Sequence, residues 1–94
     1  ETEKVEITYH LIELSNDEES YDENDIKSLE LNYELTMSTK DKTATLKLGD
    51  YTLNLTYNDN EFIVQDSEEK LPYEKRSNRI VIDYNDEKMV FREN

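Results

Sequence analysis

Residues 43–57 read TATLKLGDYTLNLTY, and apolar side chains occupy every second position on both sides of Gly49 and Asp50. A β-strand places successive side chains on opposite faces, so each half of this segment predicts a strand with one buried face. Glycine readily adopts the positive φ that a two-residue hairpin turn requires. We therefore expect Gly49 and Asp50 to join two antiparallel strands.

The same alternation runs through most of the chain. One apolar phase extends from Leu29 to Met37 and predicts another strand there. Pro72 weakens a later strand because proline has no backbone N–H to donate, so we place that strand at an edge or a bulge. Polar turn residues separate the remaining segments. These later strands are predicted over residues 61–65, 70–75, 79–84 and 87–92.

The first strand is predicted over residues 4–14, where Ile7, Tyr9 and Leu11 share one phase and Ile12 takes the other. A change of phase inside one strand is what a β-bulge produces, and bulges bend the strands of barrels. A polar loop is expected over residues 16–19.

A short helix is predicted over residues 25–29, with Asp22 or Asn24 as its N-cap. Ile26 and Leu29 are three residues apart and fall on one side of such a helix. Because so short a helix is not stable alone, we expect it to act as a lid over one end of the sheet.

Together these elements predict one domain over residues 1–94, an all-β fold of about eight short antiparallel strands with one short helix after the first strand. Consecutive hairpins of even spacing favour a meander that closes as a small barrel. A chain of this length buries only about 60 to 65% of its unfolded surface, so the core must be thin.

The order of the parts resembles a lipocalin-like domain of secreted and lipid-anchored proteins of Gram-positive bacteria. Residues 9–14 are similar to the family's opening strand, residues 25–29 to its helix, and residues 31–35 with 43–47 to its central hairpin. Residues 70–74, 79–82 and 88–92 are similar to its closing strands. The chain departs from the family in having no glycine over residues 38–42 and in carrying Tyr57 where a tryptophan is frequent. The resemblance implies a lipocalin-like barrel and an extracellular setting, and it carries no catalytic residues.

The formal net charge is −13, and such a field repels nucleic acid and anionic membranes while it favours cationic partners. The chain has no cysteine, which excludes disulfides and thiolate sites. No segment has the length of a transmembrane helix, and we expect no direct insertion of this domain into a membrane. Because the chain begins at Glu1, we expect a mature or excised form whose export signal or anchor lies outside it.

No catalytic constellation is visible. His10 is the single histidine and falls on the solvent phase of the first strand, and the chain contains no Gly-x-Ser-x-Gly motif. Acidic residues crowd positions 17–25, but they lack the glycine turn and the terminal glutamate of an EF-hand loop, so a solvated loop is favoured over a calcium site. We expect no enzyme activity, no cofactor and no bound metal.

Aromatic residues on the inward phase are the candidate ligand-binding residues. They line a cup for a small amphipathic ligand or, as the more favoured alternative, fill the core that so small a barrel needs. These residues are Tyr9, Tyr33, Tyr51, Tyr57, Tyr73, Tyr84 and Phe91.

The leading hypothesis is a non-enzymatic, extracellular binding or accessory module of a bacterial surface protein, whose partner is a small amphipathic ligand or another cell-surface protein. The alternative is a structural spacer or adhesion domain of a larger surface protein. An open, tyrosine-lined interior would favour ligand binding, and a solid core with an exposed apolar patch would favour protein contact.

Overall fold

The computed structural model describes residues 6–84 and 86–93. Within them no helix has the length and apolar character needed to cross a membrane. The elements are β1 (Glu6–Ser15), β2 (Ser20–Tyr21), α1 (Glu23–Ser28), β3 (Tyr33–Ser38), β4 (Thr43–Leu48), β5 (Tyr51–Tyr57), β6 (Glu61–Val64), β7 (Lys70–Arg76), β8 (Arg79–Tyr84) and β9 (Glu87–Glu93).

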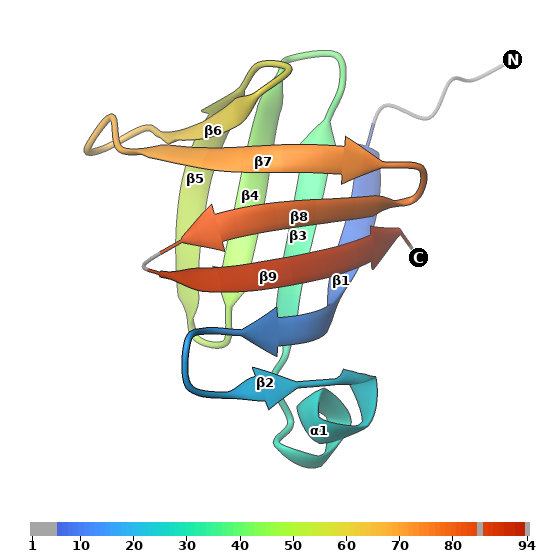
Figure 1. Ribbon diagram of the computed structural model, residues 1–94. Coiled ribbons are helices and arrows are strands. Elements are labelled where there is room, and N and C mark those ends of the chain that lie inside the picture. The colour runs from blue at the N-terminus through green and yellow to red at the C-terminus, as the bar shows by residue number, and fades with distance from the viewer. Residues whose placement is uncertain (1–5, 85, 94) are drawn as a thin grey trace, which may run out of the picture.

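Strands β1 and β3 to β9 form a closed antiparallel barrel. Each pairs with the next in chain order, and β9 pairs with β1 to complete the ring. In Figure 1 the strands β7, β8 and β9 cross in front of β3, β4 and β5, so the barrel is two layers with strands that run across one another. The predicted all-β, lipocalin-like meander barrel with one short helix after the first strand is confirmed.

Strand β1 belongs to both layers because it bends at a bulge. Its pairing with β9 shifts register between Leu11 and Glu13, which confirms the bulge that the change of phase predicted. Before the bulge β1 pairs with β3, and its last two residues pair with β2 instead. The first two residues of the predicted strand, Lys4 and Val5, lie outside the described residues.

The hairpin turns follow the sequence closely. Leu48 pairs with Tyr51 and Gly49 has a φ of 70°, so the predicted two-residue turn is confirmed. The β7–β8 hairpin is equally tight, but there Ser77 holds the left-handed position with a φ of 58°. The predicted turn between β8 and β9 includes Asn85, which lies outside the described residues.

Helix α1 begins earlier than predicted. Asp22 is its N-cap and accepts a hydrogen bond from the Asp25 N–H, while the Asp25 side chain accepts one from the Asp22 N–H. This capping box satisfies two backbone donors and fixes the first turn. Ile26 is buried, but Leu29 is the C-cap and is 55% exposed, so the prediction that Leu29 ends the helix on the same side as Ile26 is wrong. The strand predicted to follow from Leu29 begins at Tyr33.

Two further details differ from the prediction. Strand β2 was not predicted, because a pair of residues carries no readable alternation. Pro72 lies on a strand flanked by β6 and β8 rather than at the edge of the sheet. It is tolerated there because pairing with β8 starts only at Tyr73, after pairing with β6 has ended at Pro72.

Apolar side chains from all eight barrel strands meet in one core, which Ile26 of α1 completes at the lower end. The buried members from the strands are Tyr9, Leu11, Leu14, Leu35, Met37, Ala44, Leu46, Leu53, Leu55, Phe62, Val64, Leu71, Ile80, Ile82, Met89 and Phe91.

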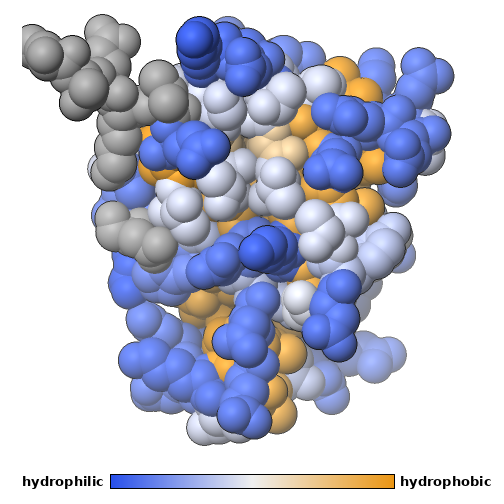
Figure 2. All heavy atoms as spheres, turned by 180° about the vertical axis from the view of Figure 1, so that it is seen from behind, coloured by the Kyte–Doolittle hydropathy of each residue, from blue (hydrophilic) through white to orange (hydrophobic). Residues whose placement is uncertain are grey.

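The outward side chains of β3, β4 and β5 form a surface that we call the threonine face. Its three cross-strand rows are Ser38–Thr43–Thr56, Thr36–Thr45–Asn54 and Glu34–Lys47–Thr52. Seen from behind, pale spheres of intermediate hydropathy occupy the middle of this side of the molecule (Figure 2).

Candidate binding site

The barrel interior is occupied by most of the aromatic residues that the sequence proposed for it. Tyr9 and Phe91 are 1% and 0% exposed and belong to the core cluster. Tyr33, Tyr57, Tyr73 and Tyr84 are partly buried and pack against it. Of the two alternatives for the interior, a ligand cup or a filled core, the packing is that of a filled core.

Tyr51 does not contribute to this core. It was predicted to point inward because it shares a phase with Leu53 and Leu55. The structure leaves it 58% exposed, so that prediction is wrong. Tyr51 is the first residue of β5, directly after the Gly49–Asp50 turn. An inward side chain at the end of a strand is buried only if another element covers that end, and the residues that the structure describes leave Tyr51 largely uncovered.

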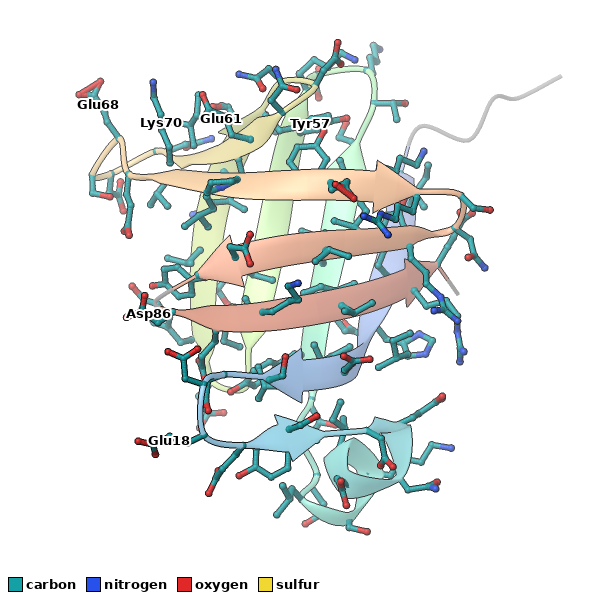
Figure 3. All side chains as sticks on the ribbon, viewed as in Figure 1. Glu18, Tyr57, Glu61, Glu68, Lys70 and Asp86 are labelled. Carbon is teal, nitrogen blue, oxygen red and sulfur yellow. The ribbon has the colours of Figure 1, made fainter. Side chains whose placement is uncertain are left out.

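Tyrosine side chains close the end of the barrel opposite α1. The Phe62 ring stands between those of Tyr57 and Tyr73, with centroid separations of 5.8 and 4.4 Å. Tyr57 donates its hydroxyl hydrogen bond to the Ser38 carbonyl at 3.0 Å, and Tyr73 donates to the Asn58 carbonyl at 2.6 Å. In Figure 3 Tyr57 lies at the upper end, between the two layers. These hydroxyls bind backbone carbonyls of neighbouring turns, so they hold this end closed.

Burial raises the pKa of the Tyr57 and Tyr73 hydroxyls above the ordinary tyrosine value. Burial also raises the pKa of Tyr9, and the carboxylate of Glu93, its partner across β9, adds to the effect. A phenolate is poorly solvated in such a place, so the hydroxyls stay protonated at neutral pH. In this protonated form Tyr57 and Tyr73 donate the hydrogen bonds that close the barrel end.

The candidate binding site lies outside the core, where β1, β3 and α1 meet. The last β1–β3 pair is His10 with Glu34; beyond it the bulge turns β1 toward the other layer and α1 bridges the gap. This arrangement leaves a pocket of about 380 Å³, which we call the seam pocket. Its lining residues are His10, Leu11, Glu23, Ile26, Lys27, Glu30, Leu31, Asn32, Tyr33 and Glu34.

The seam pocket combines an apolar base with a charged rim. Leu11 and Ile26 are buried core residues, and Leu31 is half-buried beside them. Three glutamates stand on the rim against one lysine, so the rim is acidic like the molecule as a whole. An apolar base with a few charged groups above it is the usual composition of a small-molecule site.

An ion pair fixes the helical wall of this pocket. Arg92 of β9 donates to Glu23 of α1 at 3.0 Å, and this contact joins residues that are far apart in the sequence. Arg92 is also the cross-strand neighbour of His10, which was predicted to face solvent. His10 is half-buried at the rim, with Glu34 on its other side.

The acidic segment over residues 17–25 is ordered by hydrogen bonds and one ion pair. Asn16 accepts hydrogen bonds from the N–H groups of Glu18 and Glu19, which shapes the turn between β1 and β2. Asp22 and Asp25 form the capping box, and Glu23 pairs with Arg92. In the part of the chain that the structure describes, no three metal-ligating side chains gather at one point.

A second hollow lies at the opposite end of β9. It measures about 450 Å³ and is bordered by acidic side chains of the β1–β2 and β8–β9 turns. Glu18 and Asp86 mark this end at the left of Figure 3. It has no buried apolar base, so the smaller seam pocket is the better candidate for an amphipathic ligand.

Sequence reasoning did not anticipate the seam pocket, although the signal for its origin was present. The phase change at Leu11 and Ile12 predicted the bend in β1, and a bend opens a gap beside the neighbouring strand. What remained hidden was that Glu30 to Asn32 fold beside this gap instead of extending β3.

Comparison with known proteins identifies no relative: the chain matches no family model, no curated protein and no solved structure.

Proposed function

We propose that this domain is a non-enzymatic binding module at the outer surface of a bacterial cell and that it takes a small amphipathic ligand in the seam pocket. The observation that carries the proposal is the pocket itself: an apolar base of Leu11, Ile26 and Leu31 beside a core that is already filled. The extracellular setting rests on the resemblance of the sequence to secreted lipocalin-like domains.

The charges of the pocket favour a ligand with a positively charged group. Glu23, Glu30 and Glu34 stand on its rim, and the net charge of −13 concentrates cations at the surface. Because Glu23 is already paired with Arg92, Glu30 and Glu34 are the carboxylates left to hold an ammonium or a guanidinium. An alkyl chain would lie on the apolar base.

The experiment compares octylamine with octanoate and octanol by NMR titration of ¹⁵N-labelled protein. Octylamine is expected to shift amide signals of α1, β1 and β3 in a saturable way, and octanoate is expected to bind about tenfold more weakly because its charge is reversed. Glu34→Gln should weaken octylamine binding, and Leu31→Ser should weaken binding of both octylamine and octanol.

The matched control is Glu68→Gln, which removes one exposed carboxylate far from the pocket. If octylamine instead shifted the amide signals of the core residues Tyr9 and Phe91 in a saturable way, the ligand would bind inside the barrel and not in the seam pocket. Absence of saturable binding for all three probes would favour the alternative, a structural spacer or adhesion domain. The filled interior is the observation that supports this alternative.

A further inference from the structure

The outer surface of β7, β8 and β9 differs in charge from the rest of the molecule. Nine outward residues of these three strands make up this surface, which we call the basic face. Two rows run across all three strands, Glu74–Val81–Val90 and Arg76–Arg79–Arg92. Beside them Asp83 pairs with Lys88, and Pro72 shares the outward phase of Glu74 and Arg76 on β7, just before the β7–β8 pairing begins. With four cations and two carboxylates its net charge is +2, in a chain whose net charge is −13.

All three arginines of the chain stand side by side in one row of this face. Arg76 pairs across the turn with Arg79, and Arg79 pairs with Arg92. Like charges directly opposite each other destabilise a sheet. The arrangement therefore does not serve the stability of the barrel, and an external partner is the more direct explanation for it.

The middle arginine is available to such a partner. Arg76 is bound by Glu74, and Arg92 by Glu23. Among the described residues no carboxylate lies within ion-pair distance of Arg79, which is exposed. A guanidinium with its donors directed to solvent matches a carboxylate in a two-pronged hydrogen-bonded pair.

The same face has an apolar centre. Val90 points away from the core and is only 9% exposed, and Ile12 at the bulge of β1 is 8% exposed although it also lies outside the core cluster. Val81 is half-buried next to Val90. A groove of about 340 Å³ adjoins this centre on the Val81 side, lined by Pro72, Tyr73, Glu74, Arg76, Val81, Asp83 and Lys88.

We propose that the basic face binds an acidic polypeptide segment of a partner protein, with carboxylates on the arginine row and an apolar side chain in the groove over Val81. An apolar centre with arginine at its border is the composition of a protein interface. Nucleic acid fits this face less well, because the aromatic side chain that lines the groove, Tyr73, is already stacked against Phe62 of the core, and a base has no free ring to stack on among the described residues of this face. The remaining charge of the molecule also repels a long phosphate backbone.

The test uses a fluorescein-labelled peptide, acetyl-Asp-Leu-Asp-Asp-Leu-Asp-amide, and measures its anisotropy as the unlabelled domain is added. Binding is expected to weaken about tenfold in the Arg79→Glu variant and to fall with rising salt. Arg79→Glu should fold normally, because the reversed charge stands between two arginines and removes their repulsion. A melting temperature no lower than that of the wild type checks this.

The control variant is Lys47→Glu, which makes the same charge change on the threonine face and should bind the peptide like the wild type. A control peptide with serine in place of both leucines should bind more weakly, since it has no side chain for the groove.

Four outcomes would overturn the proposal. They are no measurable binding of the peptide, an equal loss in Lys47→Glu and Arg79→Glu, equal affinity for the two peptides, and tighter binding of a single-stranded oligonucleotide. Sedimentation velocity adds a fifth, because self-association that Arg79→Glu abolishes would assign the face to a second copy of the chain.

Discussion

The threonine face and the basic face are sets of nine outward residues on opposite layers of one barrel, and they differ almost completely in composition. The first contains five threonines and no net charge, with Lys47 placed opposite Glu34. The second contains every arginine of the chain, and in one row arginine neighbours arginine.

Sheet chemistry accounts for the threonine face alone. Threonine favours the pleated, half-exposed surface of a strand, and threonine pairs across strands stabilise a sheet, as where Thr8 and Thr36 hydroxyls lie 3.5 Å apart. No such reason places three arginines in register. Outward positions are not constrained by core packing. Where their residues are ones that a strand surface does not favour, as in the arginine row, a binding role is the explanation to test.

The strongest test of this comparison replaces an inward side chain behind each face. Leu46→Ala behind the threonine face and Ile82→Ala behind the basic face should each lower the free energy of unfolding by about 2 to 5 kcal/mol, because both side chains are 0% exposed and leave a cavity. Urea denaturation measures the loss. Thr52→Ala, at an exposed outward position, should cost far less, and a similar loss there would mean that the strand phase is wrong.

The hairpin of each layer offers the next test, since the two turns use different residues at positive φ. Ser77→Gly in the β7–β8 turn should stabilise the protein and Gly49→Ser in the β4–β5 turn should destabilise it, each by about 1 kcal/mol. The space around Gly49 is open, so the effect there comes from backbone conformation alone. Thermal melting should show shifts of opposite sign, and shifts of the same sign would contradict the assigned turns.

Stability at alkaline pH tests the burial of Tyr9, which lies near Tyr57 and Tyr73 between the two layers. The pKa of Tyr9 is raised by burial and then by Glu93, so above the ordinary tyrosine pKa of about 10 the unfolded chain loses this proton before the folded chain does. The contribution of Tyr9 to the free energy of unfolding is fully present below about pH 10, the ordinary tyrosine pKa, and is lost as the pH rises through the pKa of Tyr9 in the folded protein. Tyr9→Phe should make the fall shallower in urea titrations, and an unchanged slope would exclude Tyr9 as a cause.

The smallest expected effect compares one cation from each face. Arg79→Ser removes a repulsive neighbour and Lys47→Ser removes an attractive one, although both change the net charge equally. At low salt the first variant should be more stable than the second by about 0.5 kcal/mol. High salt should remove the difference because it screens exposed charges, and a difference that persists would point to packing instead.

Local signals in the sequence were sufficient for the barrel but not for the pocket or the arginine row. The alternation of residues 43–57, the glycine at position 49 and the phase change at Ile12 each predicted what the structure has, because each acts through its own residue and its immediate neighbours. Tyr51 and Leu29 had the right period and still became exposed, since burial at the end of an element depends on what covers that end.

The sequence by itself therefore determined the eight barrel strands, their hairpins and the bend of β1, all of which follow from a period of two and from the φ that a residue tolerates. Only the tertiary structure decided that Glu23 would meet Arg92 across most of the chain, and that Glu30 to Asn32 would border a pocket beside His10. It also decided that Arg92 would join Arg76 and Arg79 in one row. These neighbours come from strands and a helix that are distant in sequence, and their distances are set by the register and closure of the whole barrel rather than by any local preference.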